Sequence, residues 1–159
     1  MLRIASLSLA VLLSTTASIG SLAAGDDITK KTATMEPAVR DGGLTYTVEC
    51  AAGTTKAEDC SVDKDTYVGW RAFGANCQQC HGGGAMGSTF APNLMELFND
   101  HVDHERFVYV LNNGYTGNIG AMPSFAANPN VLKDVDALYR YLRARADGVL
   151  PNGRPKKQK

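Results

Sequence analysis

Two cysteines and a histidine form the strongest chemical signal in this chain. The run Cys77-Gln78-Gln79-Cys80-His81 places two thiols three positions apart, with an imidazole directly after the second thiol. Thiols at this spacing can form thioethers to both vinyl groups of one haem, and the following histidine then lies under the iron as its proximal ligand. A zinc half-site would need a second ligand pair, and a redox dithiol would need a βαβ context. The sequence offers neither, so we expect covalent attachment of one haem c.

A methionine late in the chain is the expected sixth ligand of the iron. A soluble electron carrier needs an axial ligand that is hard to displace, and a thioether favours ferrous iron. Met122 lies 41 residues beyond His81, far enough for the chain to reach the opposite face of a haem, and Pro123 stiffens the loop. Met86 follows the histidine too closely, and Met95 lies in an apolar helical pattern. We therefore predict that Met122 is the ligand.

Other residues compete for roles around the haem. His101 and His104 lie in a polar stretch that is typical of a solvated helix start, and bis-histidine ligation through either is the alternative to Met122. The second ring nitrogen of the proximal histidine needs an acceptor, and we predict the carbonyl of Pro92, with a plain turn as the alternative. Side chains that could bond the haem propionates, although each is more often core or surface, are Trp70, Arg71, Tyr115 and Arg143.

The remaining two cysteines are expected to form a structural disulfide. Cys50 and Cys60 lie ten residues apart and have no adjacent histidine, so they do not form a second haem motif. In an oxidising compartment the default state of such a pair is a disulfide. It would close a short loop rich in Ala, Gly and Thr. A redox-active or metal-binding pair is the alternative.

The first residues predict export. Arg3, the apolar run 4–13 and the small residues Ser21 and Ala23 are typical of a signal peptide over residues 1–23. The run is shorter than the roughly 20 apolar residues that a membrane helix needs, and no later segment approaches that length. We expect a soluble, periplasmic mature protein that begins near Ala24. An uncleaved N-terminal anchor is the alternative.

The rest of the chain predicts an all-α protein. Residues 24–62 are expected to form an irregular extension with one short strand at 44–48. Helical patterns begin near Asp63, at 93–99, after Asp103 and near Asp134. Helices this short enclose too little apolar volume to form a stable core without a cofactor between them. We therefore expect a single domain over residues 63–150 whose helices wrap around the haem.

Charge is unevenly spread along the chain. Of the 16 basic and 16 acidic residues, Arg3 belongs to the signal peptide and four basic residues lie in the tail 151–159, which leaves residues 24–153 with 11 basic against 16 acidic. The few basic residues do not indicate nucleic-acid binding. We expect the basic tail to be a solvated, disordered end. Docking of the tail to a charged redox partner is the alternative.

Over roughly residues 63–148 the sequence resembles the small monohaem class I c-type cytochromes. Gly69 and Phe73 stand eight and four residues before Cys77, as the first helix of that fold requires. Leu138, Tyr141 and Leu142 match the last helix, whose aromatic residue packs over the glycine. The resemblance implies three to four main helices around one haem, a carrier rather than an enzyme, and the proline and distal methionine already assigned to positions 92 and 122.

A narrower similarity concerns the partner. The segments GAMPSF at 120–125, DALYRYL at 136–142, RADG at 145–148 and GRP at 153–155 resemble cytochromes that accept electrons from periplasmic pyrroloquinoline quinone (PQQ) alcohol dehydrogenases, including the four-cysteine cytochromes of methanol metabolism. This resemblance implies a dehydrogenase as electron donor and a downstream cytochrome or terminal oxidase as acceptor. The alternatives are a generic respiratory carrier and a haem enzyme or sensor with a labile sixth ligand.

Overall fold

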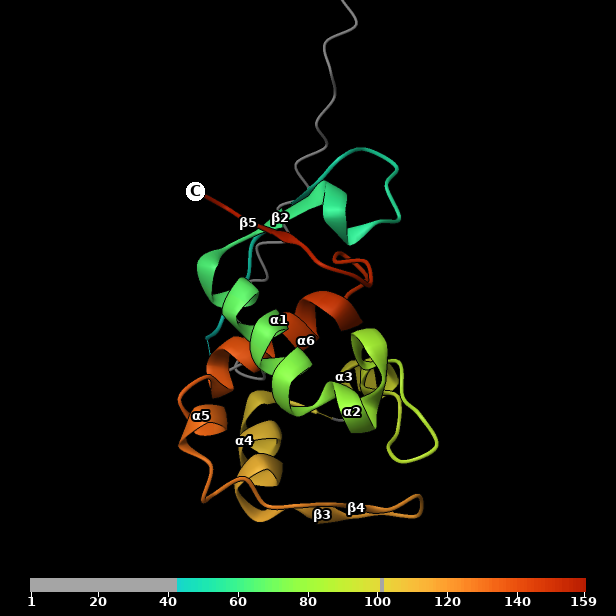
Figure 1. The fold of residues 1–159 in the computed structure, drawn as a ribbon, viewed down its shortest axis with the longest axis vertical. Helices are drawn as coiled ribbons and strands as arrows, with labels where there is room; N and C mark the ends of the chain where they lie inside the picture. Colours follow the sequence, from blue (N-terminus) through green and yellow to red (C-terminus); the bar gives the residue numbers. More distant parts are fainter. Residues whose placement is uncertain (1–42, 101) are drawn as a thin grey trace, which may run out of the picture.

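The structure, a computed structural model, describes residues 43–100 and 102–159 of the chain (Figure 1). The expected signal peptide, residues 24–42 of the expected extension and His101 lie outside the described residues. The helices are α1 (Lys64–Asn76), α2 (Gln78–His81), α3 (Leu94–Asp100), α4 (His104–Asn113), α5 (Pro129–Leu132) and α6 (Val135–Ala146), with 3-10 turns η2 (Ala57–Asp59) and η3 (Gly83–Ala85). The strands are β1 (Val48–Cys50), β2 (Cys60–Val62), β3 (Tyr115–Thr116), β4 (Ala121–Met122) and β5 (Lys156–Lys157).

Helices α1 and α6 cross at the centre of the molecule (Figure 1). Gly69 lies at the crossing, because a Cβ added there would stand 1.8 Å from the carbonyl oxygen of Ala137 and 2.9 Å from the Cβ of Tyr141. One turn later the ring of Phe73 packs against that of Tyr141, with ring centroids 5.4 Å apart. The contact of glycine with the aromatic residue of the last helix is the one that the sequence predicts. The arrangement agrees with the expected helical fold around the crossing of the first and last helices.

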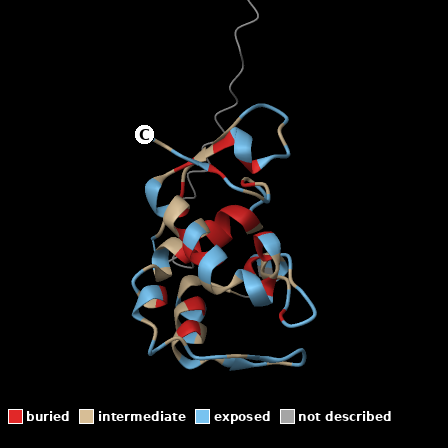
Figure 2. Cartoon of the chain, in the orientation of Figure 1, coloured by how far each residue is buried: buried red, intermediate tan, exposed pale blue. Residues whose placement is uncertain are grey.

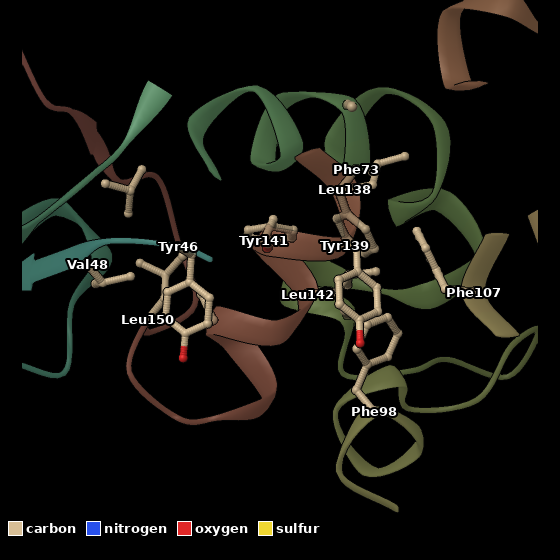
Figure 3. Packing of buried hydrophobic residues seen from close by; sticks show 14 of the residues in the cluster. Tyr46, Val48, Phe73, Phe98, Phe107, Leu138, Tyr139, Tyr141, Leu142 and Leu150 are labelled. Carbon is tan, nitrogen blue, oxygen red and sulfur yellow. The ribbon is translucent and has the colours of Figure 1, made fainter. Parts of the chain in front are cut away.

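The core is built around α6, which Figure 2 shows as the most continuously buried helix. On the side facing α3 and α4, the ring of Tyr139 contacts Phe98 and Phe107, with centroids 5.4 and 5.6 Å away (Figure 3). Leu138 and Leu142, on the same helix, are almost fully buried. The last helix therefore holds the other helices together.

Side-chain caps begin two of the predicted helices. The carboxylate of Asp63 accepts a hydrogen bond from the Thr66 amide at 2.9 Å and begins α1. Asp103 accepts from the Arg106 amide at 2.7 Å and begins α4. Such caps satisfy amides that the first helical turn leaves unpaired. The predicted starts at both aspartates are confirmed.

The extension and the C-terminal tail form one small sheet in the order β1-β2-β5. Strand β1 runs antiparallel to β2 with Cys50 opposite Cys60, and the two sulfurs form the expected disulfide. Strand β5 pairs parallel with β2 through Lys156 and Lys157, and Pro155 is buried. The expectation of a disordered tail is therefore wrong for these residues. The strand predicted at 44–48 lies at 48–50 instead, because its register follows its pairing with residues 60–62.

The disulfide should contribute measurably to stability. Because it closes a loop with a sequence separation of 10, replacing both cysteines by serine (C50S/C60S) should lower the free energy of unfolding by about 2–3 kcal/mol. Urea denaturation of the haem-containing protein measures this. A matched control is Ala52→Ser, a polar change at an exposed site inside the same loop, which should leave the midpoint unchanged. Equal midpoints for the double variant and the wild type would show that the bridge is energetically neutral.

In the part of the chain that the structure describes, no helix combines the length and apolar character needed to cross a membrane.

Candidate haem site

The haem motif sits where α1 passes into α2. The carbonyl of Cys77 accepts hydrogen bonds from the amides of Cys80 and His81 at 3.1 and 2.9 Å. One helical turn therefore presents both thiols and the imidazole. Both cysteines are free thiols, Cys77 half-buried and Cys80 exposed. Burial and the neighbouring Cys80 raise the pKa of Cys77 to about 11, so before haem attachment its sulfur would be a protonated thiol at neutral pH.

His81 is oriented by a backbone carbonyl. Its Nδ1 lies 3.2 Å from the carbonyl oxygen of Pro92, and the residue is only 7% exposed. A carbonyl can only accept, so Nδ1 carries the proton and Nε2 keeps a free lone pair for a metal. Burial also lowers the pKa of His81, which favours the neutral imidazole that a metal requires. The structure thus contains the hydrogen bond that we expected of Pro92.

A tight loop follows the histidine, and we call residues 82–87 the proximal loop. The amide of Gly87 donates to the carbonyl of His81 at 2.8 Å, and that of Ala85 donates to the carbonyl of Gly82 at 3.2 Å. Gly82 has a φ of +72°, and a Cβ added there would stand 2.3 Å from the carbonyl oxygen of Gly87. Only glycine fits such a closure.

Met122 lies on the hairpin formed by β3 and β4. It pairs with Tyr115, and the chain just beyond it is fixed to the end of α4, where the Phe125 amide donates to the carbonyl of Leu111 at 2.7 Å. Met122 is half-buried and packs against the same core cluster as Cys77. Its bond to iron remains a prediction, which this placement supports.

The rival ligands have other surroundings. The Nε2 of His104 lies 2.9 Å from a carboxylate oxygen of Asp136, and its ring meets Tyr139 edge-on at 5.1 Å. This histidine therefore links α4 to α6. Met86 is 55% exposed on the proximal loop, and Met95 packs partly buried against the core.

Two of the side chains considered for the propionates have partners within the protein. Arg143 is buried, donates to the carbonyl of Phe98 at 2.6 Å and forms an ion pair with Asp147 at 2.6 Å. The ring of Trp70 faces the C-terminal tail, with the guanidinium carbon of Arg154 5.8 Å from its centroid. Arg71 and Tyr115 are exposed. Neither Arg143 nor Trp70 needs a propionate to explain its position.

The described surface near the motif fits a large apolar group. Four large apolar side chains are more than half exposed in the loop after His81 and in the β3–β4 hairpin: Met86, Phe90, Tyr115 and Ile119. These two segments are neighbours, because a Cβ added to Gly120 would stand 3.2 Å from the carbonyl oxygen of Phe90. Paired thiols, an oriented imidazole and adjacent apolar side chains are the donor set and surface that a covalently held haem requires.

Comparisons with known proteins agree with this site. Residues 65–142 match the sequence profile of the family described as cytochrome c oxidase, cbb3-type, subunit III. The chain is 35% identical over 137 residues to cytochrome c-553I of Paracoccus denitrificans, covering 84% of this chain and 58% of that protein. It is 36% identical over 93 residues to cytochrome c-555 of Methylococcus capsulatus, covering 58% of this chain and 72% of that protein. The solved structure of the c-type cytochrome XoxG from Methylobacterium extorquens AM1 superimposes with a TM-score of 0.58 at 40% identity, covering 62% of each chain.

Fold, site and relatives together define a c-type cytochrome. The chain belongs to the class I c-type cytochromes, a family of electron-transfer proteins, and it binds covalently attached haem c. It spans little more than half the length of the Paracoccus relative.

Sequence reasoning missed one residue near the site. Arg145 is buried on α6, and its guanidinium donates to the carbonyl of Gly84 in the proximal loop. Arg145 follows Leu138, Tyr141 and Leu142 at helical spacing, but an arginine near the end of a helix is usually read as a solvated charge, so the sequence assigned it no role.

Proposed function

We propose that this protein is a periplasmic one-electron carrier with His81 and Met122 as the axial ligands of its haem iron. When bound, haem c supplies one Fe³⁺/Fe²⁺ couple that gains or loses an electron without making or breaking a covalent bond. The observation that carries the proposal is the His81–Pro92 hydrogen bond on the helical turn that also presents Cys77 and Cys80. It fixes the imidazole, and a fixed ligand keeps the geometry nearly unchanged between oxidation states. The disulfide supports an oxidising compartment.

The exposed thiol marks the edge where electrons would enter and leave. Cys80 is exposed, its carbonyl accepts a hydrogen bond from the Ser88 hydroxyl, and that hydroxyl oxygen accepts from the Phe90 amide at 3.0 Å. The 73% exposed ring of Phe90 therefore lies on a loop tied to this thiol. The basic tail lies at the opposite end of the molecule from the β3–β4 hairpin (Figure 1). Partner docking at the thiol edge would thus use apolar contacts over a small, transient interface.

For the electron donor we propose a PQQ-dependent alcohol dehydrogenase. The supporting sequence segments fall in β4 and the chain beyond it, in α6 and in the tail, and of these α6 and strand β5 of the tail contact α1, the helix that leads into the haem motif. A downstream cytochrome or oxidase would then accept the electron. This donor would make the chain a dedicated link in alcohol or methanol oxidation.

Stopped-flow reduction tests the donor. The oxidised protein is mixed with a PQQ alcohol dehydrogenase from the same organism and its alcohol, and the appearance of the reduced spectrum is followed. We expect fast, saturable reduction whose rate changes little with salt, because the proposed docking surface is apolar and salt screens only interactions between charges. The variant Phe90→Ser should lower the rate several-fold without changing the haem spectrum. Reduction no faster than that of an unrelated class I cytochrome would reject this donor and leave the carrier proposal intact.

The methionine ligand makes a separate prediction. Met122→Ala should remove the far-red methionine–iron band of the oxidised protein, lower its reduction potential and allow added imidazole to bind, because a thioether stabilises ferrous iron. Absorbance spectroscopy and a redox titration measure these changes. Met86→Ala, which removes an exposed thioether from the proximal loop, should leave the band in place. A band that survives in Met122→Ala would refute this ligand, and its absence in the wild type would favour a sensor or enzyme with an open iron.

A further inference from the structure

Arg145 places a buried charge against the proximal loop. The residue is only 9% exposed, and its guanidinium donates three hydrogen bonds to two carbonyls. Nε and Nη2 donate to the carbonyl of Gly84 at 3.2 and 3.1 Å, while Nη1 donates to that of Leu150 at 2.5 Å. Nη2 also lies 3.7 Å from the sulfur of Met86. One side chain thus joins the proximal loop to the C-terminal segment.

The hydrogen bonds from Arg145 are accepted by the loop where its backbone is in the left-handed conformation. Gly84 has a φ of +63°, and the next residue, Ala85, has a φ of +66° and is fully buried. A left-handed conformation is unfavourable at a residue with a Cβ and persists only where the surroundings impose it. The guanidinium holds the carbonyl between these two residues. It therefore restrains the peptide whose rotation would relieve the strain.

The same loop supplies one of the two backbone hydrogen bonds of His81, the other being made to Cys77 within the helical turn. The carbonyl of His81 accepts from the Gly87 amide at 2.8 Å, and this bond closes the loop. The C-terminal segment covers the loop from outside, because a Cβ added to Gly84 would stand 2.3 Å from the side-chain oxygen of Asn152. Loss of the Arg145 hydrogen bonds would therefore remove a restraint from both the proximal loop and the C-terminal segment.

We propose that Arg145 is a positioning residue for the proximal histidine: its planar guanidinium holds the proximal loop in its left-handed conformation and so fixes the backbone of His81. The planar group matters because it presents several N–H donors in a fixed geometry, which the single ammonium of a lysine does not. The inference concerns the chain itself and does not depend on which enzyme donates electrons.

Hydrogen exchange measured by NMR on the haem-containing protein tests this role. In Arg145→Met the amides of Ala85 and Gly87 should exchange at least about tenfold faster relative to the amides of α4, because the loop opens locally. Arg145→Lys should restore little of this protection. The reduction potential should fall in Arg145→Met and largely recover in Arg145→Lys, because a nearby positive charge favours the reduced iron.

Arg143→Met is the matched control. Arg143 is on the same helix and equally buried at 8%, but its bonds go to Phe98 and Asp147 rather than to the proximal loop. Its loss should lower global stability and leave the ratio of loop to α4 exchange unchanged. A uniform rise in exchange in both methionine variants would overturn the positioning role. Full protection of the loop in Arg145→Lys would overturn it too, and this variant remains informative if Arg145→Met does not fold.

Discussion

Replacing both Cys77 and Cys80 by alanine should abolish covalent attachment of haem, and with it most of the stable, folded protein. The two free thiols sit on one helical turn, and His81 lies beside them with its ring fixed on Pro92. Without thioethers only the two proposed axial ligands, His81 and Met122, and non-covalent packing would retain the cofactor. Haem staining after denaturing electrophoresis measures the attachment. We expect a complete loss of staining in the double variant and a reduced yield of soluble protein.

Two further variants, Cys80→Ala and C50S/C60S, serve as controls for this test. Cys80→Ala should retain haem through one thioether, visible as a red-shifted pyridine haemochrome spectrum, because one vinyl group stays unsaturated. The double variant C50S/C60S should stain like the wild type, since those sulfurs form a disulfide in another part of the structure. Staining that persists without Cys77 and Cys80 would show that haem is attached elsewhere.

The features that the sequence predicted well depend on short-range chemistry. The motif at 77–81 encodes its own function, because thiol spacing within one helical turn fixes which groups can react. The caps at Asp63 and Asp103 bond to amides three residues ahead, so they too can be read locally. The hydrogen bond between His81 and Pro92 joins residues eleven positions apart, so local spacing alone does not predict it. The resemblance to a known family supported this prediction.

The features that were missed depend on long-range pairing. Lys156 and Lys157 look like a solvated tail, yet their backbone pairs with β2, and backbone hydrogen bonds leave no pattern in polar side chains. Arg143 and Arg145 stand two positions apart on one helix and look alike in the sequence. Only the tertiary structure shows that the first bonds Phe98 and the second the proximal loop.

The exposed apolar residues show why such a short chain needs its cofactor. Helix α6 collects aromatic rings from α1, α3 and α4 into one cluster, while Phe90, Tyr115 and Ile119 stay more than half exposed near the motif. Large exposed apolar side chains that gather in one region indicate a binding surface. A covalent haem can cover apolar surface there. The cofactor thus contributes to the fold as well as to the chemistry.

Replacing Gly69 by alanine should be among the most damaging single changes in the protein. The added Cβ would stand 1.8 Å from the carbonyl oxygen of Ala137, and backbone atoms cannot move aside as a flexible side chain can. Helices α1 and α6 must then separate, which opens the contact between Phe73 and Tyr141. We expect the free energy of unfolding to fall by roughly 3 kcal/mol or more, measured by urea denaturation of the haem-containing protein.

Gly74→Ala is the control that isolates the close approach. Gly74 lies in the same helix and is exposed, and the nearest atom to an added Cβ is the side-chain oxygen of Gln78 at 3.8 Å. Both substitutions raise helix propensity equally, so Gly74→Ala should stabilise the protein by up to about 1 kcal/mol. Opposite signs for the two variants would place the cost of Gly69→Ala in the helix crossing. If Gly69→Ala were as stable as Gly74→Ala, the two helices could not approach as closely as the fold requires.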